Sequence, residues 1–182
     1  LVKNHLLNTL SDCPEIKNPI EKRFVDYFQK YCEQYGGEKW QLYSYLDIEI
    51  QNIQTAIQIA YQHELWPSLS DLVYSIMEYL DRRVMWKELV DYSRLALDAA
   101  MVMGDKSRVA RYKVFGLGWI QATRFGLFEE GLESIREGKS IALSVGDKRR
   151  YAMALRDEGV VLRRMNQLND AKKIVEESLN LF

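Results

Sequence analysis

Apolar residues recur at intervals of three and four along most of this chain, which is the spacing of amphipathic helices. The longest stripe runs from Leu42 to Ala60, and glycines or Trp66-Pro67 separate neighbouring stripes. The pattern predicts helices over residues 1–12, 18–35, 39–63, 67–82, 86–103, 105–125, 127–145, 147–165 and 169–182. We therefore expect an all-α fold of about eight or nine helices.

The helix over 18–35 has a clear predicted start. Asn18 can cap its first turn, and Pro19 suits the first helical position, where its missing N–H is harmless. Gly36-Gly37 ends it. Its predicted buried side consists of Ile20, Phe24, Phe28, Tyr31 and Tyr35.

The second half of the chain repeats itself. Gly104-Asp105 and Gly146-Asp147 open two similar copies 42 residues apart, and each copy contains two predicted helices. A period in the forties with two helices per period indicates stacked helical hairpins, here over 67–103, 105–145 and 147–182. The offset falls to 40 between Gly131 and Ala171, so the middle copy carries a local insertion or a shifted helix.

Several glycines fall inside these predicted helices, where each costs about 1 kcal/mol relative to alanine. We expect them to allow neighbouring helices to approach closely; a hinge or a ligand-approach role is the alternative. These glycines are Gly116, Gly118, Gly131, Gly138 and Gly159.

At these positions the sequence resembles the tetratricopeptide repeat family, whose pattern is Leu-Gly in the first helix and small, aliphatic and Ala-Leu positions in the second. The last copy carries Glu158-Gly159, Leu162, Ala171, Val175 and Ser178-Leu179. The period exceeds the usual 34 of that family. The longer period resembles that of the C-terminal arrays of NB-ARC/STAND-type signalling ATPases. The stretch from Leu46 to Ile53 also resembles the helix that opens such arrays.

The resemblance implies a right-handed superhelix of stacked antiparallel helix pairs. Residues 1–66 would form an N-terminal helical cap that leads into tetratricopeptide-like repeats over 67–182, within one continuous domain. It also implies a protein-interaction or ligand-sensing module of a larger cytosolic signalling or transcription-regulating ATPase. Its partner would be a peptide, a protein or an autoinhibitory segment, including the nucleotide-binding domain of its own parent chain. The apolar end at Phe182 suggests a cut or a repeat still to come.

Charge and composition limit the kinds of partner that this chain is expected to bind. The 182 residues have a formal net charge of −1, which gives no general reason to expect nucleic acid or a membrane surface. No apolar run approaches the roughly 18 residues of a membrane span. The two cysteines, Cys13 and Cys32, fit free thiols in a reducing cytoplasm; a disulfide between them is the alternative.

Chemistry-bearing motifs are weak. Gly131 to Gly138-Lys139 superficially resembles a phosphate loop, but six residues intervene and no strand precedes it, so Lys139 is expected on a solvated helix face. His5 and His63 are far apart and near no Cys-x-x-Cys pair. We expect no metal, no cofactor and no catalytic residue, hence no enzyme.

Basic residues offer a candidate partner site. The first helix of each hairpin usually lines the groove of such arrays, and arginine forks suit carboxylates. We expect an acidic peptide or protein surface to bind Lys113, Arg124, Arg156, Arg163 and Arg164. An ordinary solvated charged face is the alternative. A passive scaffold or self-association arm, and a small molecule or nucleic acid in the basic groove, are the rival functions.

A second candidate is an aromatic cluster in the first third of the chain. Aromatic side chains supply large buried areas and are favoured at interfaces. We expect most of this cluster in the core of the N-terminal cap, with contacts to an upstream domain as the alternative. Its members are Tyr27, Tyr31, Tyr35, Trp40, Tyr43 and Tyr45.

Overall fold

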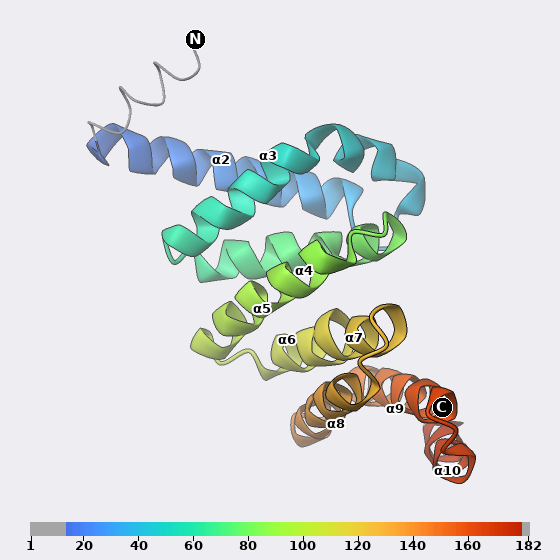
Figure 1. Cartoon of the computed structure of the whole chain (residues 1–182). Coiled ribbons are helices and arrows are strands. Elements are labelled where there is room, and N and C mark those ends of the chain that lie inside the picture. Colours follow the sequence, from blue (N-terminus) through green and yellow to red (C-terminus); the bar gives the residue numbers. More distant parts are fainter. Residues whose placement is uncertain (1–13, 180–182) are drawn as a thin grey trace. The chain divides into compact units, whose positions relative to one another are not determined.

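The computed structural model describes residues 14–179, and all regular structure in this part of the chain is helical (Figure 1). The elements are α2 (Pro14–Tyr35), η1 (Trp40–Leu42), α3 (Tyr43–Gln62), α4 (Trp66–Arg82), α5 (Trp86–Val102), α6 (Lys106–Arg111), η2 (Tyr112–Trp119), α7 (Ile120–Arg124), α8 (Phe128–Ser144), α9 (Lys148–Arg164) and α10 (Leu168–Leu179). Because α6, η2 and α7 are continuous, the described residues form eight helices beside the short η1 turn, and the all-α prediction is confirmed. The helix predicted over 1–12 lies outside them, as do His5 and Cys13.

The chain divides into two compact units between Tyr79 and Leu80, inside α4. The predicted division at residue 66 follows the change in repeat pattern, whereas this one follows packing. Each unit is described by itself below. A single continuous domain and a right-handed superhelix stay predictions.

From α3 onward, the connections between successive helices share one backbone conformation. Each contains a residue in the left-handed region, namely Glu64, Val84, Gly104, Gly126, Gly146 and Asn166, with φ between 54° and 72°. The N–H of the following residue reaches back into the helix that ends there, as from Asp105 to the Ala100 carbonyl and from Asp147 to that of Ala142, both 2.9 Å. This is the Schellman way of ending a helix. The turns predicted at Gly104, Gly126, Gly146 and Asn166 are confirmed.

In the first unit, α2 differs from its prediction. It is already helical from Pro14, the first described residue, so Pro19 lies inside the helix and the N-cap predicted at Asn18 is wrong. The buried side is Val25, Phe28 and Cys32, whereas Ile20 is 46% exposed, so the predicted stripe is rotated toward Val25.

Only Tyr43 of the aromatic cluster is fully buried, and Tyr31 and Tyr35 are half-buried, so the predicted core role is wrong for the exposed Tyr27, Trp40 and Tyr45. Tyr43 is buried and packs edge-on against Tyr79, with 5.3 Å between ring centroids. Tyr27 and Trp40 are exposed. Tyr27, Tyr31 and Tyr35 recur every fourth residue along one flank of α2, and Tyr35 stacks on Tyr45. The rings therefore cover one another instead of filling the core.

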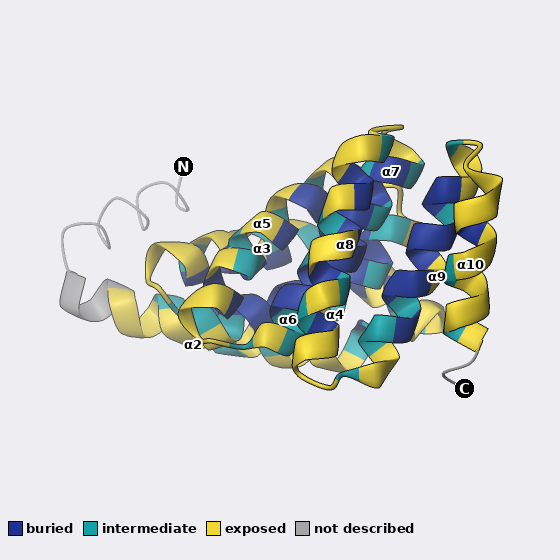
Figure 2. Cartoon of the chain, turned by 90° about the horizontal axis from the view of Figure 1, so that it is seen from below, coloured by how far each residue is buried: buried dark blue, intermediate teal, exposed yellow. Residues whose placement is uncertain are grey.

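In the second unit the helices pack in chain order from α5 to α10. The first helices of the last two hairpins, α6–α7 and α9, also touch along their length: Ser107 donates to Asp147 at their starts, and Arg164 donates to the Thr123 carbonyl at their ends. The two helices therefore run parallel. Their core includes Ala122, Ile135, Ala154, Val161 and Leu162, and Figure 2 shows buried, dark blue positions on α7, α8 and α9.

The first helix of the middle hairpin contains a π-helical segment, η2. From Lys106 to Arg124 this helix is two residues longer than α9, which spans Lys148–Arg164. A π-turn accommodates an extra residue without breaking a helix. The local insertion predicted from the repeat offsets is confirmed, and η2 is where it is accommodated.

Three helix-interior glycines of the second unit, Gly118, Gly131 and Gly138, lie at close approaches, as predicted. A Cβ on Gly131 would lie 2.7 Å from the Gly118 carbonyl oxygen, and one on Gly118 would lie 2.8 Å from that of Gly131. A Cβ on Gly138 would lie 2.6 Å from Val114. No side chain fits between α8 and η2 at these points, so the packing explanation holds for all three.

Candidate functional site

Two of the five predicted site residues lie at helix ends and bond to the preceding hairpin. Arg124, at the end of α7, makes two hydrogen bonds of 3.2 and 3.3 Å to Asp81, and its guanidinium lies 5.3 Å from the centroid of the Trp86 ring. Arg164, at the end of α9, donates to the Thr123 carbonyl at 3.1 Å. Both cations thus link a helix end to the preceding hairpin.

The other three residues point elsewhere. Lys113 pairs with Glu137 on α8. Arg156 pairs with its neighbour Asp157 at 2.7 Å, although its side chain is 61% exposed. Arg163 borders a hollow between α9 and α10 and forms no hydrogen bond or ion pair within the described residues. No contact network joins all five here, and their role in binding stays a prediction.

A charged cluster connects the starts of α6 and α9. Asp147 caps α9 by accepting from the Arg150 N–H at 3.0 Å, and it also accepts from Ser107 at 2.6 Å. Arg150 in turn donates to Ser107 at 2.9 Å. Partial burial raises the pKa of Asp147, but the hydrogen bonds from Ser107 and Arg150 and the charge of Arg150 outweigh it, so the pKa lies below its ordinary value. This cluster holds the two copies in register.

A buried carboxylate connects α9 to α8. Glu158 is 2% exposed and receives Arg136 at 2.8 Å and Lys139 at 2.5 Å. The phosphate-loop-like stretch from Gly131 to Lys139 lies inside one helix, which supports its rejection as a phosphate site. The expectation of a merely solvated Lys139 is wrong, because the neighbouring hairpin brings a buried acid to it.

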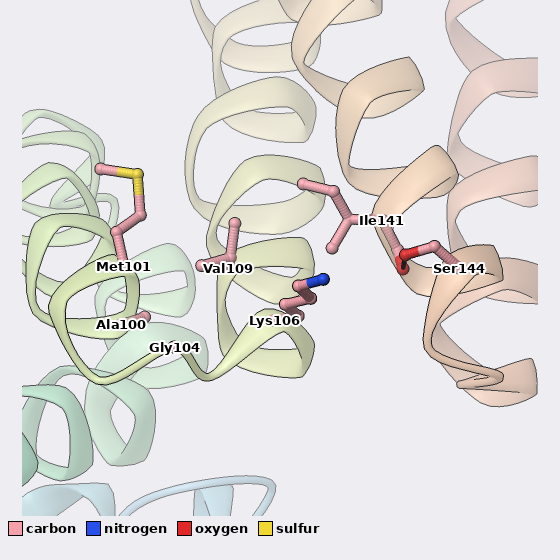
Figure 3. A pocket seen from close by; sticks show the side chains of 7 residues that line it. All are labelled: Ala100, Met101, Gly104, Lys106, Val109, Ile141 and Ser144. Carbon is pink, nitrogen blue, oxygen red and sulfur yellow. Dashed lines mark hydrogen bonds between the residues drawn. The ribbon is translucent and has the colours of Figure 1, made fainter.

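An apolar groove lies between the C-terminal ends of α5 and α8. It has a volume of about 300 Å³ and is lined by Ala100, Met101, Gly104, Lys106, Val109, Ile141 and Ser144. Figure 3 shows Met101 and Val109 facing Ile141 across it, with Lys106 between them on the first turn of α6. The Lys106 ammonium group forms no hydrogen bond or ion pair within the described part of the chain. The groove thus combines an apolar surface with one uncompensated positive charge.

Exposed apolar side chains at the two helix ends extend this surface. Met101 is 55% and Val102 is 65% exposed at the end of α5, and Leu143 is 60% exposed at the end of α8. Met101 and Leu143 lie 42 residues apart, and so do Lys106 and Lys148. The repeat therefore presents an apolar residue before each Gly-Asp turn and a lysine after it.

Sequence reasoning missed this groove, although one signal was present. The apolar runs Met101-Val102-Met103 and Ile141-Ala142-Leu143 continue to the ends of their helices, beyond the face that packs on the core. Two consecutive apolar residues at a helix end cannot both face one neighbour. The excess predicts an exposed apolar surface at that end.

Within residues 14–179, no three His, Cys, Asp or Glu side chains are grouped so as to hold a metal ion. None of the helices described there is long and apolar enough to cross a bilayer. Cys32 is a buried free thiol, and burial followed by the charge of Glu33 raises its pKa to about 12, so it is poorly nucleophilic.

No family model matches this sequence, and neither does any curated protein. The likeness to tetratricopeptide repeats and to NB-ARC-type arrays therefore stays a resemblance, carried by the residues named above.

Proposed function

We propose that this chain is a protein-interaction module and not an enzyme. The observation that carries the proposal is the apolar groove between α5 and α8, with the exposed Met101 and with Lys106, which has no ion pair within the described residues. Methionine adapts to irregular partners and is common on peptide-binding surfaces. Exposed apolar patches with a polar rim mark interaction sites.

The groove favours a segment with large apolar side chains and a nearby carboxylate. Met101, Val109 and Ile141 offer apolar contacts, while Lys106 offers a charge to an acid. An amphipathic helix supplies both along one side, because its residues at intervals of three and four share a face. This agrees with the acidic partner expected from the basic residues, of which Arg163 has no partner within the described residues.

The finer proposal places this module in a larger cytoplasmic signalling or transcription-regulating ATPase. Its support is the resemblance of the hairpins and of the Leu46–Ile53 stretch to the arrays of such proteins. The bound segment would then be a peptide, a protein or an autoinhibitory part of the parent, including its nucleotide-binding domain. Binding would bias the parent between two states by differential affinity, with no cofactor held by this chain.

A peptide titration tests the interaction. The probe is a synthetic acidic amphipathic helix of about 14 residues with leucines on one face, and binding is followed by amide chemical shifts of the labelled chain. We expect shifts at Met101, Val109 and Ile141 around the groove. Met101→Glu should weaken binding about tenfold or more by burying a charge opposite the apolar face.

Two matched controls sharpen the result. Leu179→Glu makes the same exchange on α10, at a side chain that is 71% exposed, and should leave peptide affinity unchanged. A probe of identical composition with scattered leucines should not bind. Equal loss with both variants, or shifts that avoid α5, α6 and α8, would contradict the groove as the site.

A second candidate function is a scaffold or self-association arm without a regulatory ligand. The observation that favours it is the apolar side of α10, where Leu168 and Leu179 are more than half exposed.

A further inference from the structure

The second helices of the last two hairpins correspond residue by residue at an offset of 40. Ile135 meets Gly118 in the middle hairpin just as Val175 meets Gly159 in the last one. Ile135 is fully buried because α9 packs over α8, whereas Val175 is 41% exposed. The side of α10 that corresponds to the covered side of α8 is open within the described residues, and Figure 2 shows most of α10 as exposed.

The charges on this open side do not suit another helix of the α9 kind. On α8, Arg136 and Lys139 receive the buried Glu158 of α9. The corresponding residues of α10 are Glu176 and Leu179. If another helix packed on α10 as α9 packs on α8, its glutamate equivalent to Glu158 would lie against Glu176 and Leu179. The complementary partner carries a cation opposite Glu176 and an apolar residue opposite Leu179.

The helix α10 itself has this composition. Leu168, Lys172, Val175 and Leu179 follow at intervals of four, three and four, so they form one stripe. Lys172 lies 3.8 Å from Glu176, and the two side chains are 77% and 59% exposed. We propose that α10 is a docking surface for a second copy of this chain, packed antiparallel about a twofold axis that crosses the stripe midway between Lys172 and Glu176, at the level of Ile174.

This arrangement satisfies both requirements. A twofold interface pairs residue i with residue j and j with i. With the axis near Ile174, Lys172 lies opposite the partner's Glu176, and Glu176 opposite the partner's Lys172. The Leu168 end of each helix then lies beside the Leu179 end of the other, so apolar side chains meet at both ends.

A hollow between α9 and α10, beside the stripe, can accept apolar side chains of the second copy. It has a volume of about 370 Å³ and is lined by Gly159, Val160, Arg163, Leu168, Ala171, Lys172 and Val175. The opposite flank of α10 is held to α9 by the Tyr151 hydroxyl, which donates to Glu177 at 2.5 Å, and by Ser178, which donates to the Ala152 carbonyl at 3.4 Å. The open stripe is therefore presented on a fixed helix. A contact of about one helix per partner is small, so the dimer is reversible.

Sedimentation velocity of the full chain over a range of concentrations tests the proposal. We expect a monomer–dimer equilibrium that Lys172→Glu weakens about tenfold, because the substitution places two like-charged pairs across the axis. The double variant K172E/E176K restores opposite charges and should restore dimerisation. High salt should reduce the difference between K172E and the unchanged chain.

The matched control is Lys173→Glu. Lys173 is equally exposed, at 77%, and pairs within its own helix with Asp170, but it lies beside the stripe. It should leave dimerisation unchanged. A chain that stays monomeric throughout, an equal effect of K172E and K173E, or no rescue by the double variant would each overturn the proposal. Met101→Glu should not alter dimerisation, so this result is independent of peptide binding at the groove.

Discussion

The middle hairpin, α6 to α8, and the last hairpin, α9 to α10, have the same local design but different surroundings. Both begin with an aspartate that caps the first helix, Asp105 or Asp147, and both have a left-handed residue at the internal turn, Gly126 or Asn166. In the middle hairpin, Gly131 lies against the backbone of Gly118 and Ala122, where a Cβ would not fit. The corresponding residue of the last hairpin is Ala171, whose side chain is accommodated. The comparison teaches that repeated sequence fixes the conformation of each copy, while neighbours decide how tightly each copy packs.

The largest expected effect concerns a glycine that lets the two helices of the middle hairpin pack more closely than those of the last hairpin. A Cβ on Gly131 would lie 2.7 Å from the Gly118 carbonyl oxygen and 2.8 Å from the Ala122 nitrogen, both backbone atoms. Gly131→Ala should destabilise the chain by about 2 kcal/mol or more, because α8 must move away from η2. Urea unfolding followed by circular dichroism measures the shift in midpoint.

Gly159→Ala is the matched variant in the last hairpin. There the nearest atom is the Cγ2 methyl of Val175 at 2.8 Å, on a side chain that is 41% exposed, and the nearest backbone atom, the Ala171 carbonyl oxygen, is 3.6 Å away. The gain in helix propensity, about 1 kcal/mol, should offset the adjustment. If both variants lose the same stability, the contrast in packing between the hairpins is wrong.

The next effect compares the two capping aspartates. Asp105 accepts from the backbone N–H of Arg108 at 3.0 Å and pairs with the Arg108 guanidinium at 3.3 Å, so both contacts are local. Asp147 adds the hydrogen bond from Ser107 of the preceding copy. Asp147→Ala should cost about 2 kcal/mol and Asp105→Ala about 1 kcal/mol, by thermal or urea unfolding.

The Asp147 effect should depend on pH. Its pKa is lowered in the folded chain because the hydrogen bonds from Ser107 and Arg150 outweigh partial burial. Its stabilisation is therefore complete above the unfolded value of about 3.9 and is lost as pH falls through the folded pKa. The difference between Asp147→Ala and the unchanged chain should be constant from about pH 5 upward and shrink below about pH 4. A difference that persists in acid would contradict this role of the charge.

The smallest effect concerns the turns. Val84 occupies the left-handed position that glycines occupy at residues 104, 126 and 146, with φ of 62° and 61% exposure. A β-branched residue is strained there. Val84→Gly should stabilise the chain by about 1 kcal/mol, read as a higher unfolding midpoint. Gly146→Val should lower the midpoint, and an unchanged midpoint for both variants would show that these turns carry no strain.

Much of the fold could be predicted from the sequence because helix signals are local. The stripe from Leu42 to Ala60 and the Gly-Asp turns define their elements without reference to any neighbour. The buried side of α2 could not be predicted in the same way. Val25 and Tyr27 are both apolar enough to be buried, and only the packing of α2 in its unit chooses Val25.

The candidate site was less predictable for the same reason. Each basic residue could be placed on its helix, but Asp81 and Arg124 are 43 residues apart, so their pairing depends on how α7 packs. The groove forms only because the end of α5, with Met101, and the end of α8, with Ile141, lie close together in the fold. The sequence shows the excess of apolar residues there, but not the surface that they share.

The sequence by itself determined the helices, their turns and the repeat, because hydrophobic period, caps and left-handed residues act within a few positions. Only the tertiary structure decided that Lys139 meets a buried acid, that Ile135 is covered while Val175 is open, and that Lys106 faces an apolar groove without an ion pair among the described residues. These outcomes depend on residues that lie one helix or more away in the chain. Burial and charge pairing are properties of neighbours in space, and a periodic pattern specifies a face without specifying what covers it.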